Sequence, residues 1–166
     1  MGGFNINKYR IPEPSEVDMI ATKKIFEFFM SAYGSAREKV GRNRMPKITQ
    51  SFELIPATTK REYAGDAERI VVEREMYLPE FIELDRLFWE GYSAISDPLK
   101  KGGTERRRQI FMLRYVHGIT IQNVTERTYL SKTTVIDESK LGLIQFCKAT
   151  EMLVMRNETE PLIKID

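Results

Sequence analysis

The stretch Ser131-Lys132-Thr133-Thr134 combines three hydroxyl groups with one ammonium group at a point where a helix is expected to begin. A serine at the N-cap position accepts hydrogen bonds from backbone N–H groups that have no partner within the helix. The side chains that follow project from an exposed helix N-terminus, which favours phosphate. Lysine and threonine side chains placed there can also reach base edges in the major groove of DNA. These residue types at this spacing therefore predict a contact with duplex DNA.

Two short helices and a turn must position this stretch. From Thr104 to about Phe146, the pattern predicts a scaffold helix capped by Thr104, a stop at Gly118, a short helix after Thr120, and a turn at residues 128–130 that leads to the Ser131-capped helix. Gly118 can take the positive φ that ends one helix before the next begins. We expect a small apolar core to fix the angle between the two short helices, made by Ile121, Val124, Leu130 and Val135. This order is the sequence outline of a helix-turn-helix.

Positive charge accompanies this outline. Residues 100–148 carry ten Lys and Arg against four Asp and Glu, although the whole chain has a net charge of only +2. Basic side chains neutralise backbone phosphates, and such binding weakens as the salt concentration rises. We therefore expect phosphate contacts from Arg106, Arg107, Arg108, Arg114, Arg127, Lys132 and Lys140. The other candidate DNA-binding residues carry hydroxyl groups: Thr120, Ser131, Thr133 and Thr134.

The N-terminal part of the chain predicts further helices, so the expected fold class is all-α. A first helix spans about residues 15–40, with Ser15 as N-cap and Gly41 as stop. Its apolar residues recur at roughly helical spacing: Val17, Ile20, Ile25, Phe28, Phe29 and Ala32. Residues 42–65 form a basic linker interrupted by prolines. We expect an N-terminal helical region at 1–98, which includes this linker, and a helix-turn-helix domain with a C-terminal tail at 99–166.

A second long helix is expected to begin at Asp66. Pro79 lies within it, so we expect a kink or a break near Leu78. The aromatic cluster Phe88, Trp89 and Tyr92 predicts burial in a core or in a dimer interface. Residues 66–90 carry eight acidic residues against three arginines, and this acidic face is interpreted as solvated surface.

Composition argues against several classes of protein. With one cysteine, Cys147, and one histidine, His117, the usual Cys/His zinc sites cannot be assembled, and we expect neither a metal nor a cofactor. Cys147 is expected to be a buried apolar residue, and His117 to interact with a helix C-terminus. We find no constellation of catalytic residues and expect no enzyme. The start, MGGFNINKYR, lacks the apolar stretch of a signal peptide, and no uncharged apolar run approaches the length of a membrane span, so we expect a cytoplasmic protein.

The segment YVHGITIQNVTERTYLSKTTVIDESKLGLIQF resembles the region-4-like helix-turn-helix of sigma-70-type factors. The residues that match the pattern are Tyr115, Gly118, Thr120, Val124, Glu126, Leu130, Ser131, Thr134, Val135 and Leu143. The wider order of an N-terminal helix, GRNRMPKIT, a long helix and this module is similar to the ArpU family of phage transcriptional regulators. The resemblance implies a regulator of late packaging and lysis genes, which binds double-stranded DNA in the cytoplasm of a bacterial host.

Two features depart from the sigma-like pattern. Tyr129 stands in the turn where the pattern usually has glycine or a small polar residue, and a positive φ there would strain it. Asp137 and Glu138 fall on the expected recognition helix, where they would repel phosphate but could accept hydrogen bonds from cytosine amino groups.

Alternatives to this hypothesis remain open. Because one such module reads few base pairs, homo-oligomerisation through the N-terminal helices is a reasonable expectation. A small terminase subunit of a phage also joins a helix-turn-helix to oligomerisation helices. A sigma-like module that contacts host RNA polymerase, with weak DNA contact, is a further possibility. The basic block Arg37 to Arg61 is interpreted as an added arm along the DNA.

Overall fold

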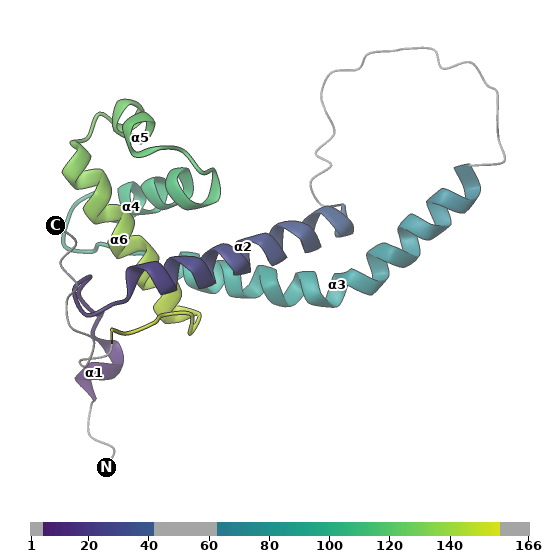
Figure 1. The fold of residues 1–166 in the computed structure, drawn as a ribbon, viewed down its shortest axis with the longest axis horizontal. Coiled ribbons are helices and arrows are strands. Elements are labelled where there is room, and N and C mark those ends of the chain that lie inside the picture. Colours follow the sequence, from purple (N-terminus) through teal and green to yellow (C-terminus); the bar gives the residue numbers. More distant parts are fainter. Residues whose placement is uncertain (1–4, 42–62, 157–166) are drawn as a thin grey trace. The chain divides into compact units, whose positions relative to one another are not determined.

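The computed structural model of the chain describes residues 5–41 and 63–156, and these residues are all-α, as the sequence predicts (Figure 1). Their elements are α1 (Ile6–Tyr9), α2 (Met19–Val40), α3 (Tyr63–Ala94), α4 (Gly103–Phe111), the π-helical turn η1 (Met112–Val116), α5 (Ile121–Thr128) and α6 (Lys132–Ala149). Most of the expected basic linker, and residues 157–166 of the C-terminal tail, lie outside the described residues. None of the helices in the described ranges combines the length and apolar character that crossing a membrane requires.

The chain divides into two compact units. The first unit comprises Met1–Phe28 and Leu87–Asp166, and the second comprises Phe29–Arg86. The boundary expected after residue 98 therefore falls inside the first unit, because segments on both sides of it pack together. Ile95 is fully buried, and the ring of Phe26 meets the ring of Phe146 edge-on, with their centroids 5.2 Å apart.

The N-terminal segment is joined to the C-terminal segment by backbone as well as side-chain contacts. Val17 and Met155 form an isolated antiparallel bridge, and the Asp18 N–H donates to the Val154 carbonyl oxygen at 2.9 Å. Buried Thr22 accepts a hydrogen bond from the Val154 N–H at 3.1 Å through its hydroxyl group. These contacts join positions more than a hundred residues apart in the sequence, which explains why no local pattern predicted them.

Helix α2 begins later than expected. The Oδ1 atom of Asp18 accepts from the Ile20 and Ala21 N–H groups at 3.1 and 2.9 Å, so Asp18 takes the capping role expected of Ser15. Gly41 has a φ of +71° directly after the last helical residue, Val40, as predicted.

The apolar face of α2 also differs from the expected one. Of the predicted apolar residues, Val17 and Phe29 are buried, but Ile20 is 84% exposed and Phe28 also faces solvent. The buried positions of the helix instead step by three or four along one face: Thr22, Phe26, Phe29, Tyr33, Ala36 and Val40. Spacing alone could not distinguish the expected set of residues from the buried set, because both roughly follow the helical period.

Helix α3 is one unbroken element. It begins at Tyr63, so Asp66 lies inside it instead of capping it, and it runs through Pro79 without the break considered near Leu78. Of the aromatic cluster, Phe88 is buried, but Trp89 is 54% exposed and therefore does not belong to the core of the described chain. Within the second unit, the Tyr33 hydroxyl donates to Asp85 Oδ1 at 2.8 Å and its ring stacks on Phe81.

Candidate nucleic-acid interface

Helices α4, α5 and α6 surround a small apolar core. Each helix contributes one completely buried side chain: Ile110 from α4, Val124 from α5 and Val135 from α6. The partly buried residues packed against them are Leu113, Ile119, Ile121 and Leu130. The structure thus brings together all four residues that were predicted to fix the angle between the two short helices.

The connections between these helices follow the expected signals in part. Gly118 has a φ of +64° between η1 and α5, and Thr120 caps α5 by accepting from the Asn123 N–H at 3.3 Å. The cap expected of Thr104 does not form. The N-cap of α4 is Gly102, and the Thr104 hydroxyl accepts from the Asp97 N–H at 2.9 Å.

The leading turn of α6 is capped as predicted. Ser131 Oγ accepts from the Thr134 N–H at 3.1 Å, and the two hydroxyl oxygens lie 2.8 Å apart. Thr134 is half-buried, whereas Ser131, Lys132 and Thr133 are exposed. The first turn of α6 therefore presents its polar side chains to solvent.

One side of α6 remains open over more than two turns. Because an α-helix has 3.6 residues per turn, residues 132, 133, 136, 137 and 140 lie on one face. Lys132, Thr133, Asp137 and Lys140 are exposed, and Ile136 is half-buried. We call these five residues the outer face of α6. Val135, Leu143 and Phe146 are buried, as the sequence predicts.

Tyr129, in the turn between α5 and α6, holds the conformation that the sequence identified as a source of strain. Its φ is +56° and its ψ is +27°, in the left-handed region that favours glycine. The side chain is 94% exposed, so no packing within the described chain accounts for the aromatic residue. Strained positions of this kind concentrate at functional sites.

The three consecutive arginines of α4 form hydrogen bonds with other groups of the protein. Arg107 is buried, and its Nε donates to Glu138 Oε2 at 2.6 Å while its Nη1 donates to the Ser96 carbonyl oxygen at the same distance. Its Nη2 lies 3.3 Å from Asp97 Oδ2. The expectation of a phosphate contact from Arg107 is therefore corrected, since its guanidinium is enclosed by protein groups.

The two neighbouring arginines are also tied to the protein. Arg108 donates to the carbonyl oxygens of Ile95 and Ser93, both at 2.9 Å. Arg106 Nη2 donates to Glu138 Oε1 at 3.4 Å. These bonds explain why a run of arginines marks this helix, and they favour a structural role over phosphate binding for Arg106 and Arg108.

Glu138 does not lie on the outer face of α6. Its side chain is buried beneath the helix, where it receives the hydrogen bonds of Arg106 and Arg107. The expectation that Glu138 would repel phosphate or read cytosine is corrected accordingly. Asp137 is exposed, so it is the acidic residue on this face.

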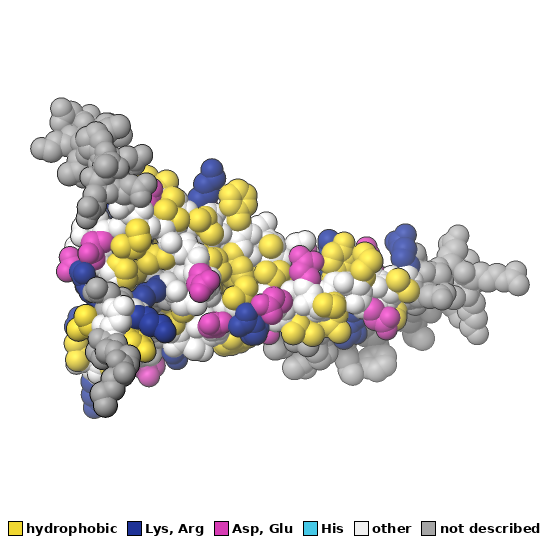
Figure 2. Space-filling view, turned by 90° about the horizontal axis from the view of Figure 1, so that it is seen from below, with side chains coloured by type: hydrophobic (Ala, Val, Ile, Leu, Met, Phe, Trp, Pro, Cys, Tyr) yellow, Lys and Arg dark blue, Asp and Glu magenta, His cyan; other side chains and the backbone are white. Residues whose placement is uncertain are grey.

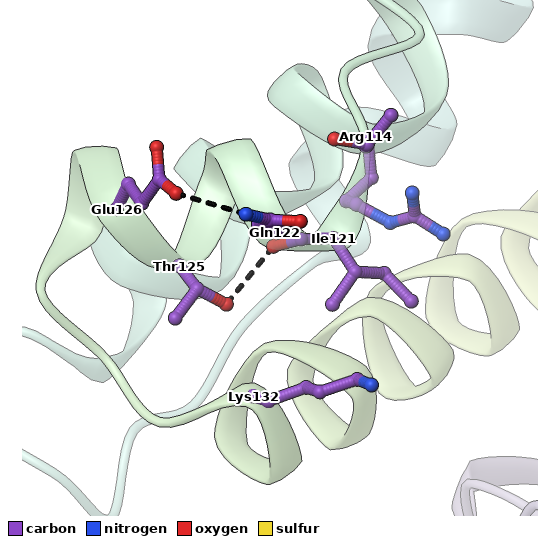
Figure 3. A pocket seen from close by; sticks show the side chains of 7 residues that line it. Arg114, Ile121, Gln122, Thr125, Glu126 and Lys132 are labelled. Atoms are coloured by element: carbon purple, nitrogen blue, oxygen red, sulfur yellow. Dashed lines mark hydrogen bonds between the residues drawn. The ribbon is translucent and has the colours of Figure 1, made fainter.

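A groove of about 660 Å³ lies beside the leading turn of α6 (Figure 3). Gln122, Thr125 and Glu126 of α5 line one side of it, and Lys132 of α6 lines the other. Arg114 also borders the groove, and its Nη1 donates to the Ile119 carbonyl oxygen at 3.0 Å. The Nε of Arg114 is buried and has no hydrogen-bond partner among the described residues.

The remaining predicted residues lie on α5 and α6 or directly before α5. Thr120 lines the groove as well as capping α5. Arg127 is exposed in the last turn of α5, and His117 is exposed at the end of η1. Lys140, farther along α6, is exposed and borders a second groove against α2. Sequence reasoning missed this second groove and its residues Lys23 and Lys24, although two adjacent lysines on one helix were a visible signal.

Burial controls the acidity of two groups in the first unit. Burial raises the pKa of the Cys147 thiol to about 12, and it raises the pKa of the Tyr115 hydroxyl to about 12 as well. Cys147 is fully buried, which confirms its expected role as a small apolar residue.

Taken together, the described residues form an all-α protein with an exposed, serine-capped helix next to a short helix and a strained turn. Comparison of the chain with known protein families, curated proteins and solved structures found no match.

Proposed function

We propose that the protein is a sequence-specific DNA-binding transcriptional regulator, in which α5, the turn and α6 act as a helix-turn-helix. In this proposal the outer face of α6 enters the major groove of duplex DNA. The observation that carries the proposal is the open, Ser131-capped leading turn of α6, which is held by a buried core on its opposite side. Lys132 and Thr133 are exposed there and would meet base edges.

Phosphate contacts in this proposal come from basic residues around α6. Arg114, Arg127, Lys132 and Lys140 border the grooves or lie exposed near them, whereas Arg106, Arg107 and Arg108 are engaged with protein groups. Fewer phosphate contacts are thus available than the sequence suggested. The salt dependence of binding should therefore be weaker, because each missing phosphate contact lowers the magnitude of the log–log slope by about 0.9.

The resemblance to ArpU-like regulators supports a more specific role. It adds to the proposal that the regulated genes are late phage or prophage genes, and that the protein acts in the cytoplasm of the bacterial host. A contact with host RNA polymerase remains the alternative role for the same module.

Self-association is part of this proposal, because one helix-turn-helix reads few base pairs. In the second unit, four large apolar side chains of α3 are more than half exposed: Val71, Val72, Met76 and Ile82. Figure 2 also shows hydrophobic side chains exposed between acidic and basic ones. Sedimentation of the full chain tests this point, and a monomer that binds promoter DNA tightly would argue against it.

The experiment that tests the proposed function is selection of bound duplexes from a random pool, carried out at two salt concentrations. We expect a consensus sequence and an affinity that falls with salt. The test variant is Lys132→Ala with Thr133→Ala, which should relax the consensus. The control variant is Lys100→Ala with Lys101→Ala, which removes two charges at exposed positions and should leave the consensus unchanged. Selection without a consensus, or affinity that is independent of salt, would overturn the proposal.

A further inference from the structure

A second groove, of about 630 Å³, separates the N-terminal half of α2 from α6. Both sides belong to the first unit. Met19, Ile20, Lys23, Lys24 and Glu27 line it from α2, and Tyr115, Lys140 and Leu143 line it from the opposite side. Three ammonium groups and one carboxylate therefore surround this groove, which is positively charged overall.

Lys140 connects this groove to the outer face of α6. Lys132 borders the first groove and Lys140 borders the second, eight residues later on the same helix face. At 1.5 Å per residue these two positions are about 12 Å apart along the helix axis. Arg114 lines the first groove and the next residue, Tyr115, lines the second. The two grooves thus follow each other along one edge of α6.

We propose that Lys23 and Lys24 of α2 form a second DNA contact, which binds backbone phosphates beside the segment of duplex that α6 enters. This inference rests on the proposed function, and it adds an element outside α4, α5 and α6 to the DNA-binding surface. The occupant of the groove is the sugar-phosphate backbone of the duplex. The contact positions the protein on the DNA and does not read its sequence.

The three lysines of the groove favour this occupant, whereas Met19, Ile20, Tyr115 and Leu143 make the rest of its lining largely apolar. Lysine carries a compact charge on a flexible stem, which suits phosphate oxygens whose positions vary with DNA sequence. Lys23 lies 3.6 Å from Glu27 in an exposed i,i+4 pair. Such pairs contribute little to stability, so Lys23 can exchange the carboxylate for a phosphate at small cost. Lys24 is exposed on the same helix.

The test measures the affinity of the full chain for the selected duplex and for a scrambled duplex over a range of salt concentrations. In the variant with Lys23→Ala and Lys24→Ala, the log–log slope should fall by about 1.8, which is 0.9 for each lost phosphate contact. At 0.15 M salt the affinity should drop roughly ten- to thirtyfold on both duplexes. The ratio of the two affinities should stay unchanged, since phosphate contacts carry no sequence information.

Two matched variants sharpen this test. Lys100→Ala with Lys101→Ala removes the same charge from exposed positions outside both grooves and should change the slope little. Glu27→Gln removes the carboxylate of the groove and should raise the affinity severalfold on both duplexes. Thermal unfolding of each variant checks its fold, which substitutions at these exposed positions should preserve.

Each outcome is decisive. An unchanged slope for the variant with Lys23→Ala and Lys24→Ala would overturn the second contact while leaving the proposed function intact. An equal loss for the variant with Lys100→Ala and Lys101→Ala would overturn it too, because it would show that only total charge matters. A parent protein that binds no duplex in a salt-dependent manner would instead overturn the proposed function itself.

Discussion

Tyr129 stands out because its backbone conformation and its side chain are both costly in isolation. A non-glycine residue in the left-handed region costs about 1 kcal/mol or more, and an exposed tyrosine buries nothing in return. Glu151, which directly follows the C-cap of α6, shares this conformation with a φ of +59°. Among the described residues, these are the two non-glycine positions with a positive φ, one beside the proposed DNA-binding surface and one at the other end of α6.

Replacement of each of these residues by glycine separates stability from function. Tyr129→Gly and Glu151→Gly should both raise the free energy of unfolding, by about 0.5–1 kcal/mol, because glycine adopts a positive φ without strain. Urea denaturation measures this. If the tyrosine is retained for DNA contact, only Tyr129→Gly should also weaken duplex binding. Equal binding by the two variants would show that Tyr129 does not contact DNA.

The buried thiol of Cys147 should make the free energy of unfolding depend on pH in the alkaline range. Its pKa is raised by burial from 9.0 to about 12, so the folded protein holds this proton more tightly than the unfolded chain does. The resulting stability is fully present below pH 9 and is lost as the pH rises from 9 towards 12. At pH 10 the loss is on the order of 1 kcal/mol relative to neutral pH. The measurement is urea denaturation at pH 7, 9 and 10, with Cys147→Ala as the reference. An identical pH dependence in parent and variant would contradict the assignment.

Between elements, the decisive contact ties α4 to α6. Glu138 lies on the buried side of α6, and its Oε2 accepts a hydrogen bond from Arg107 of α4 at 2.6 Å. The same arginine lies 3.3 Å from Asp97. This ion pair therefore joins the inner face of α6 to α4. A buried ion pair that loses one partner leaves an uncompensated charge.

Glu138→Ala should therefore destabilise the fold by about 3 kcal/mol or more, since Arg107 would keep only Asp97 as an acidic partner. Asp137→Ala, at the adjacent exposed position, should change stability by less than about 0.5 kcal/mol. For duplex DNA the larger effect is expected from Asp137→Ala, because removal of this exposed carboxylate should raise the affinity. Urea denaturation and a binding titration of both variants check the pair of outcomes. Comparable stability for the two would show that the buried ion pair contributes little.

Local sequence signals predicted several helix ends and the small apolar core. They did not predict contacts between residues that are far apart in the sequence. Ser131, Gly118 and the apolar core of α4, α5 and α6 are short-range features, and the structure confirms each of them. The partners of Arg107 are different, because Asp97 and Glu138 reach it from other elements. A run of arginines looks the same in the sequence whether it faces phosphate or a buried carboxylate.

The sequence did not predict which segments of the chain form each of the two compact units. Phe146 of α6 packs against Phe26 and Phe88, with ring centroids 5.2 and 5.9 Å apart, and both partners precede the boundary expected at residue 98. Gly91 belongs to the same contact, since a Cβ atom there would lie 2.6 Å from the Phe146 ring. The C-terminal helices therefore depend on residues that the sequence assigned to a separate region.

This dependence predicts that residues 99–166 alone will not fold. Without Phe26 and Phe88, the buried rings of Phe111 and Phe146 lose their cover, and each exposed ring costs about 1.5–3 kcal/mol. Together the two losses amount to about 3–6 kcal/mol, a large share of the 5–15 kcal/mol that stabilises a typical domain. By contrast, residues 1–28 joined to 87–166 by a flexible Gly/Ser linker contain the first unit and should fold cooperatively. Circular dichroism with urea denaturation compares the two chains, and a cooperative transition in the shorter one would show that α4, α5 and α6 form an independent domain.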